Sequence, residues 1–67
     1  MEPTLAEARI LDHVARGKTN KQIARALTIE VSTVKRHLYK AYSKLGATNR
    51  TQAAIIWRGR SEFREVA

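Results

Sequence analysis

Apolar residues recur at helical spacing in four segments of this 67-residue chain, and no segment shows the strict alternation that is typical of a β-strand. Short polar stretches separate the segments, and each of the three glycines stands where a helical segment ends. The pattern predicts an all-α fold in a single compact domain, residues 1–67. The predicted helices cover about residues 5–16, 20–27, 31–45 and 49–58, followed by a tail at residues 60–67.

The first two predicted helices begin with the same local motif. Thr4 is followed three residues later by Glu7, and Thr19 is followed in the same way by Gln22. In such a capping box each side chain pairs with the backbone N–H of the other residue, which satisfies donors that the helix start leaves open. A turn of about three residues then separates the second helix from the third, and we expect Ile29 of this turn to lie in the core.

The third predicted helix has two different faces. At about 100° per residue, Val34, Leu38, Ala41 and Leu45 fall within one narrow arc, which predicts the core face. The other side is basic and bears hydroxyl groups, with no acidic residue. It carries Ser32, Lys35, Arg36, Tyr39, Lys40 and Ser43. A short helix, a short turn and a longer helix with an outward basic face form a helix-turn-helix arrangement.

The charge distribution points to a polyanionic partner. The formal net charge is +7, from 13 basic and 6 acidic side chains. Eleven of the basic residues lie between His13 and Ser61, together with a single acid, Glu30. Nucleic acid is the favoured partner, although charge alone also allows an acidic membrane surface. No apolar run approaches the roughly 20 residues of a membrane span, so we expect no membrane partner and a cytoplasmic location.

The residues give little support to an enzyme. The chain has no cysteine, which excludes disulfides and thiolate metal sites. It offers no carboxylate pair, no nucleophile beside a base and no glycine loop for phosphates. His37 has no second metal ligand nearby in sequence, and Trp57 is expected in the core or at an interface. We therefore expect no catalysis, no cofactor, no metal and no small-molecule ligand in this domain.

Duplex DNA fits the third helix, because the second helix of a helix-turn-helix lies in the major groove. Arg36 can fork onto guanine O6 and N7, and Lys35 can reach the same atoms or a phosphate. Tyr39 can contact a thymine methyl group or a phosphate. Residues near helix starts are suited to hold phosphate oxygens. These are Asn20, Lys21, Ser32 and Thr33.

The chain from residue 7 to about residue 57 resembles the LuxR-type helix-turn-helix domain, also called the GerE or FixJ/NarL C-terminal effector domain, and within it the MalT-like subgroup. The matching segments are TLAEARILDHVARG, TNKQIARAL, STVKRHLYKAYSKLG and TNRTQA. The resemblance implies a four-helix DNA-binding domain of a bacterial transcription regulator. In this family a sensor or receiver part usually precedes the domain, so the chain is expected to be either an excised C-terminal domain or a small stand-alone regulator.

The resemblance also implies roles for individual residues. Base readout falls to Lys35, Arg36 and Tyr39. Phosphate contacts extend to Lys40 and Arg50, in addition to the residues near helix starts. A dimer contact falls to the fourth helix, which implies a homodimer at least on DNA, with RNA polymerase as a further partner. The implied dimer residues are Thr51, Ala54, Ile55 and Arg58.

One departure from the family affects the DNA-facing region. The third helix usually begins with a serine cap, and here Glu30 takes that position. A carboxylate suits the positive end of the helix dipole, but it repels a nearby phosphate. The phosphate contacts at the start of the third helix are therefore expected to differ from those of the family.

Three other functions remain open at this point. A promoter-reading region 4 of a sigma factor shares a related helix-turn-helix, although the segment NRTQA favours the LuxR type. A protein-interaction module working through the fourth helix is suggested by the apolar run at residues 53–57, which one short helix cannot bury completely. RNA binding is weaker, because the few aromatic residues form no paired stacking platform.

Overall fold

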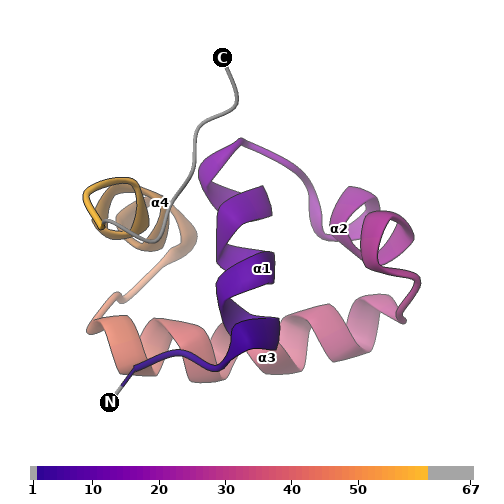
Figure 1. Ribbon diagram of the computed structural model, residues 1–67, viewed down its shortest axis with the longest axis horizontal. Coiled ribbons are helices and arrows are strands. Elements are labelled where there is room, and N and C mark those ends of the chain that lie inside the picture. Colours follow the sequence, from indigo (N-terminus) through magenta and orange to yellow (C-terminus); the bar gives the residue numbers. More distant parts are fainter. Residues whose placement is uncertain (1, 61–67) are drawn as a thin grey trace.

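The computed structural model describes residues 2–60, and in this part of the chain all regular structure is helical. Figure 1 shows α1 crossing α3, with α2 and α4 on either side of α1 above opposite ends of α3. The predicted all-α fold with a helix-turn-helix is confirmed. Residues 61–67 of the predicted tail lie outside the described residues. The helices are α1 (Leu5–Ala15), α2 (Asn20–Leu27), α3 (Val31–Leu45) and α4 (Arg50–Arg58).

Side-chain caps fix where three of the helices begin. The Thr4 hydroxyl accepts a hydrogen bond from the Glu7 backbone N–H at 3.2 Å, and the Glu7 carboxylate accepts from the Thr4 backbone N–H at 2.8 Å. Thr19 and Gln22 form the same reciprocal pair. In α4 the cap is Asn49, so this helix begins one residue later than expected. Glu30 precedes α3 but makes no side-chain capping hydrogen bond.

Left-handed backbone conformations end the first three helices. Gly17 follows α1 at φ +81°, and Gly46 follows α3 at φ +71°. α1 itself ends at Ala15, one residue before the predicted end. Thr28 ends α2 at φ 57°, which is unusual for a β-branched residue. Its conformation turns the chain so that Ile29, partly buried against the core, leads into α3, and this completes the helix-turn-helix.

The core has two parts that meet at α1. One part lies between α1, α2 and α3, and the other lies between α1, α3 and α4. The predicted core face of α3 is confirmed, since Val34, Leu38 and Ala41 are buried and Leu45 packs half-buried beside them. Leu5 shares the helical spacing but is 69% exposed at the first position of α1. The first part contains Ile10, Val14, Ile23, Ala24, Val34 and Leu38, and the second contains Leu11, Ala15, Ala41, Ala53 and Trp57.

Polar groups inside the fold are paired across helices. The Lys44 ammonium donates to the Glu7 carboxylate at 2.7 Å, and the Trp57 indole N–H donates to Asp12 at 2.7 Å. Burial by itself raises the pKa of Glu7. The Lys44 ammonium and the donors of Thr4 outweigh this effect, so the pKa of Glu7 lies below its ordinary value. α1 is thereby joined to α3 at its start and to α4 near its end.

Candidate nucleic-acid interface

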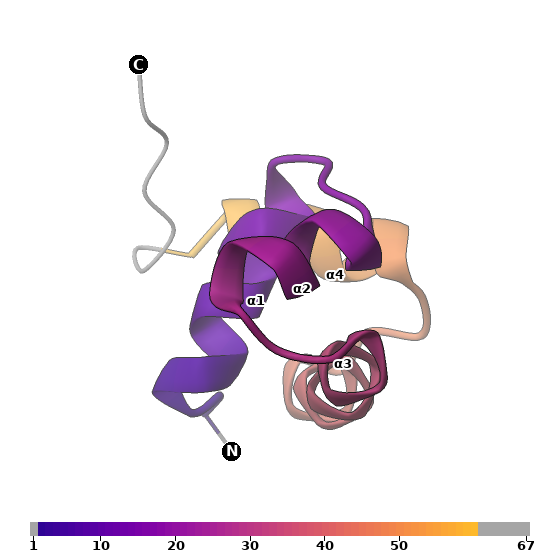
Figure 2. The ribbon, with the colours of Figure 1, turned by 90° about the vertical axis from the view of Figure 1, so that its right-hand side faces the viewer.

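One side of α3 is not covered by the other helices of the described residues 2–60. Figure 2 looks almost along α3 and shows the other helices above and beside it, with the opposite side free. Six exposed residues occupy this side, and we call them the α3 surface. They are Ser32, Lys35, Arg36, Tyr39, Lys40 and Ser43. The outward direction follows from the helical repeat, because the buried positions of α3 lie on the opposite arc.

The cations of the α3 surface have no partner among the described residues. Lys35, Arg36 and Lys40 make no hydrogen bond or ion pair within residues 2–60, and Tyr39 is 78% exposed. The surface is therefore basic, rich in donors and available to a partner.

Three of the four acidic residues within residues 2–60 are paired away from the α3 surface. Glu7 pairs with Lys44, Asp12 accepts from Trp57, and Glu2 pairs with Arg60. None of these three acids belongs to the α3 surface, so they leave its positive charge unpaired within residues 2–60. The remaining acid of the described residues, Glu30, stands at the start of α3 and is exposed.

The N-terminal half of α3, which carries Lys35 and Arg36, is held by α2. Ile23 and Ala24 of α2 are buried in the same part of the core as Val34. The turn at Thr28 sets the direction of α3 relative to α2. These contacts place the exposed residues of α3 on a rigid support, as a reading helix requires.

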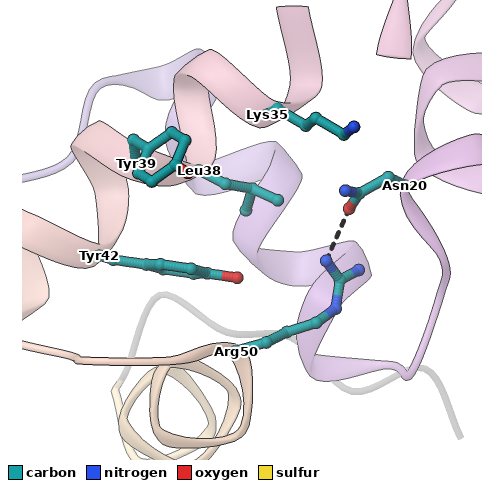
Figure 3. A pocket seen from close by; sticks show the side chains of 6 residues that line it. All are labelled: Asn20, Lys35, Leu38, Tyr39, Tyr42 and Arg50. Atoms are coloured by element: carbon teal, nitrogen blue, oxygen red, sulfur yellow. Dashed lines mark hydrogen bonds between the residues drawn. The ribbon is translucent and has the colours of Figure 1, made fainter. Parts of the chain in front are cut away.

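An open cleft of about 400 Å³ lies beside the α3 surface, between α2, α3 and the start of α4. Figure 3 shows side chains from all three helices pointing toward it. Arg50 does not stand free at its edge, because it donates to Asn20 Oδ1 and to the Lys18 carbonyl, both at 2.6 Å. The cleft is lined by Asn20, Lys35, Leu38, Tyr39, Tyr42 and Arg50.

Sequence reasoning named most of these lining residues but missed how they are joined. Arg50 and Asn20 were expected to contact phosphate separately, and the structure brings them into a direct hydrogen bond. They are 30 residues apart, so no local pattern could reveal the pair. Tyr42 packs partly buried against both parts of the core, and it also lines the cleft. Nothing in the sequence around Tyr42 indicates that it lies at the cleft.

The other residues with implied roles lie at various depths. Lys21 and Ser32 are exposed, whereas Thr33 is half-buried in the first turn of α3. On α4, Thr51 is exposed and Ile55 is 64% exposed. The two remaining α4 residues differ: Ala54 packs half-buried against the core, and Arg58 Nε donates to the Ala15 carbonyl at 2.8 Å.

Two findings concern sites other than nucleic acid. Within residues 2–60 no three histidine, cysteine, aspartate or glutamate side chains gather in a way that could hold a metal ion. In the same part of the chain no helix has the length and apolar character needed to cross a membrane.

The fold and the exposed basic helix define a helix-turn-helix domain of four helices, with α3 in the position of the reading helix. The family described as bacterial regulatory proteins, luxR family, matches residues 4–57. The chain belongs to this luxR family. The family match confirms the resemblance to the LuxR-type domain and favours it over region 4 of a sigma factor, whereas the MalT-like subgroup stays a prediction.

Curated relatives carry the same kind of domain in longer chains. The chain is 48% identical over 52 residues to the transcriptional regulatory protein LiaR of Bacillus subtilis strain 168, covering 78% of this chain and 25% of LiaR. It is 46% identical over 54 residues to the CsgBAC operon transcriptional regulatory protein of Escherichia coli K12, covering 81% and 24%. For the HTH-type transcriptional regulator AlkS of Alcanivorax borkumensis the identity is 46% over 50 residues, covering 75% and 6%. The chain thus spans about a quarter of the length of the first two.

Proposed function

We propose that this domain binds duplex DNA sequence-specifically, with α3 in the major groove, and that it serves in bacterial transcription regulation. The observation that carries the proposal is the α3 surface, whose cations have no partner within residues 2–60. An α-helix fits the major groove, where each base pair presents a different set of donors and acceptors. The relatives LiaR and the CsgBAC operon regulator, which are named as transcriptional regulatory proteins, support the same function.

Base readout is assigned to the centre of the α3 surface. Arg36 donates in a bidentate manner to a guanine, Lys35 reaches an adjacent base edge, and Tyr39 contacts a thymine methyl group. Phosphate contacts surround this centre and set the register of the helix in the groove. They are assigned to Asn20, Lys21, Ser32, Thr33 and Lys40. The family resemblance gives Arg50 the same role, but its guanidinium donates to Asn20 and to the Lys18 carbonyl within the domain.

Dimerisation is proposed through the outer side of α4, with Ile55 at its centre and Thr51, Ala54 and Arg58 around it. The helix has nine residues, which corresponds to a length of about 13 Å. Two such helices bury far less than the roughly 1,200 Å² of a stable interface, so we expect a dimer on DNA and a monomer in free solution. Half-sites should then lie about one helical turn apart. RNA polymerase is proposed as a further partner, and the cytoplasm as the location.

The experiment is a selection from a pool of random duplexes by the 67-residue chain, with sequencing of the bound fraction and fluorescence anisotropy of the enriched duplex at two salt concentrations. We expect an enriched motif with two-fold symmetry. Enrichment of a single half-site would remove the dimer from the proposal. Binding without enrichment would mean that the α3 surface contacts phosphates only, and no binding at low salt would end the proposal.

A second candidate is a protein-interaction module that works through α4. The specific observation in its favour is Ile55, a large apolar side chain that is 64% exposed. Arg36→Glu separates the two functions, because charge reversal on the α3 surface abolishes DNA binding but leaves an α4 partner bound. Ile55→Asp is the matched variant with the opposite expectation.

A further inference from the structure

Arg50 makes contacts inside the domain that bear on its assigned role. It is the first residue of α4, and its guanidinium reaches across to the start of α2. Nη1 donates to Asn20 Oδ1 and Nη2 donates to the Lys18 carbonyl, each at 2.6 Å. Arg50 therefore ties α4 to the loop and helix that precede α3, instead of extending toward a partner.

The Arg50 hydrogen bond determines which way the Asn20 amide faces. A guanidinium has donors only, so the amide atom in contact with it must be the oxygen. The amide nitrogen Nδ2, which carries two donors, then points into the cleft on the side of Lys35 (Figure 3). Without Arg50 the amide could rotate by half a turn about its last bond, and its donors would leave the cleft for part of the time.

The other groups at the cleft also favour an anion. The Lys35 ammonium and the Tyr42 hydroxyl point toward the same space, and Leu38 lies between them (Figure 3). Asn20 and Lys21 are the first two residues of α2, whose backbone N–H groups have no partner within the helix. Donors from two helices thus converge at the edge of the α3 surface, where a DNA backbone would pass.

We propose that Arg50 is a positioning residue, which holds the Asn20 amide so that Nδ2 donates to one DNA phosphate seated in the cleft. Arg50 itself does not neutralise that phosphate. The inference rests on the proposed function, because the DNA supplies the phosphate. It also gives the start of α4, the helix assigned to dimerisation, a direct link to the start of α2, which is assigned to phosphate binding.

The test compares the parent chain with Asn20→Ala, Arg50→Lys and the double variant. Arg50→Lys keeps the charge, but one ammonium cannot reproduce the two-armed contact of the guanidinium. Binding to a labelled mixed-sequence duplex is measured by anisotropy between about 50 and 200 mM salt. We expect each single change to weaken binding about fivefold, as for one lost hydrogen bond, and the double variant to be no weaker than either. The slope of log affinity against log salt should stay at the parent value.

Two further variants, Arg50→Ala and Lys21→Ala, test the alternative that Arg50 neutralises a phosphate. If Arg50 neutralised a phosphate by its own charge, Arg50→Ala would lower the salt slope by about 0.9, and Arg50→Lys would bind like the parent. A variant that combines Arg50→Ala with Asn20→Ala would then bind more weakly than either single variant, by the product of the two affinity losses. Lys21→Ala, assigned to a phosphate by its own charge, is the control that shows such a slope change. All titrations are run at a temperature where circular dichroism reports each variant as folded.

A measurement without DNA separates this inference from the proposed function. In ¹⁵N–¹H spectra of the parent, the side-chain amide signals of Asn20 should lie away from the positions of an amide without a hydrogen bond. In Arg50→Lys the same signals should move to those positions. Unmoved signals would overturn the positioning role. If the parent bound no duplex at all, the proposed function would fail, and the amide signals would still decide whether Arg50 orients Asn20.

Discussion

Two sets of cations on neighbouring parts of the molecule have the same chemistry and opposite surroundings. The first set stands on the α3 surface and makes no hydrogen bond or ion pair within residues 2–60, whereas each member of the second set donates to a group on a different segment. The first set is Lys35, Arg36 and Lys40, and the second is Lys44, Arg50 and Arg58. One set is available to a partner, and the other holds the helices together.

Lys40 and Lys44 show that position decides between the two sets. They lie about one helical turn apart on α3. Lys40 is exposed, but the start of α1 lies over Lys44, whose side chain is only 17% exposed and pairs with Glu7. The net charge of +7 therefore does not measure the charge offered to a partner. If the two sets are independent, a change in the first should alter DNA affinity but not folding stability, and a change in the second should alter folding stability.

The largest effect is expected from Lys44→Ala on folding stability. The change leaves the buried Glu7 carboxylate without its cation, and we expect a loss of about 3 kcal/mol, at the low end for a broken buried pair because Lys44 is partly exposed. Lys40→Ala is the matched control and should stay within about 0.5 kcal/mol of the parent. Urea unfolding followed by circular dichroism measures both, and equal losses would show that the pair does not distinguish them.

Arg36→Ala should act in the opposite way. We expect a loss of about 2 kcal/mol in affinity for the selected duplex, with relaxed preference at one base pair, because a bidentate contact to guanine is removed. Stability should not change, since Arg36 is exposed and makes no hydrogen bond or ion pair within residues 2–60. Arg9→Ala removes the same charge from the exposed side of α1 and serves as the control. Equal losses on selected and random duplexes would contradict the assignment of base readout.

A smaller effect, with a pH signature, is expected from Glu7→Gln. Because the pKa of Glu7 is lowered on folding, its ion pair stabilises the fold above the unfolded pKa, and this contribution is lost as the pH falls through the folded pKa. Gln22 shows that glutamine supports the same capping box, so the cap should survive. We expect a loss of about 1.5 kcal/mol at neutral pH and a flatter decline below about pH 4.5. An unchanged acid profile would contradict this role.

The smallest effect is expected from Lys21→Ala. Affinity should fall by a similar small factor for every duplex, and the salt slope should drop by about one unit, because one phosphate contact is lost. Anisotropy titrations on the selected duplex and a random duplex measure both quantities. A loss confined to the selected duplex would move Lys21 from phosphate contact to base readout.

Local signals made most of the fold predictable from the sequence. The capping boxes at Thr4 and Thr19 and the core arc of α3 depend on residues within a few turns of one another, and all are present in the structure. Leu5 shows that helical spacing alone does not predict burial. It has the spacing of a core residue, but it is the first residue of α1 and its side chain is exposed. The exposed residues of the α3 surface followed from the same repeat.

The internal contacts of the site could not be predicted in this way. Arg50 meets Asn20 across 30 residues, Arg58 meets Ala15 across 43, and Trp57 meets Asp12 across 45. Such pairs depend on how α4 packs against α1 and α2, which is a tertiary property. The sequence therefore indicated which residues are polar and near the interface, but not which of them are already used by the fold.

The isolation of the α3 surface from the interior has a consequence for how this domain can change over generations. Lys35, Arg36 and Tyr39 are exposed, belong to neither part of the core and make no hydrogen bond within residues 2–60. Such exchanges carry almost no folding penalty, so each can be selected purely on what the helix recognises. A duplicated copy of this domain could acquire a new target sequence in single steps, every one of which is a stable protein.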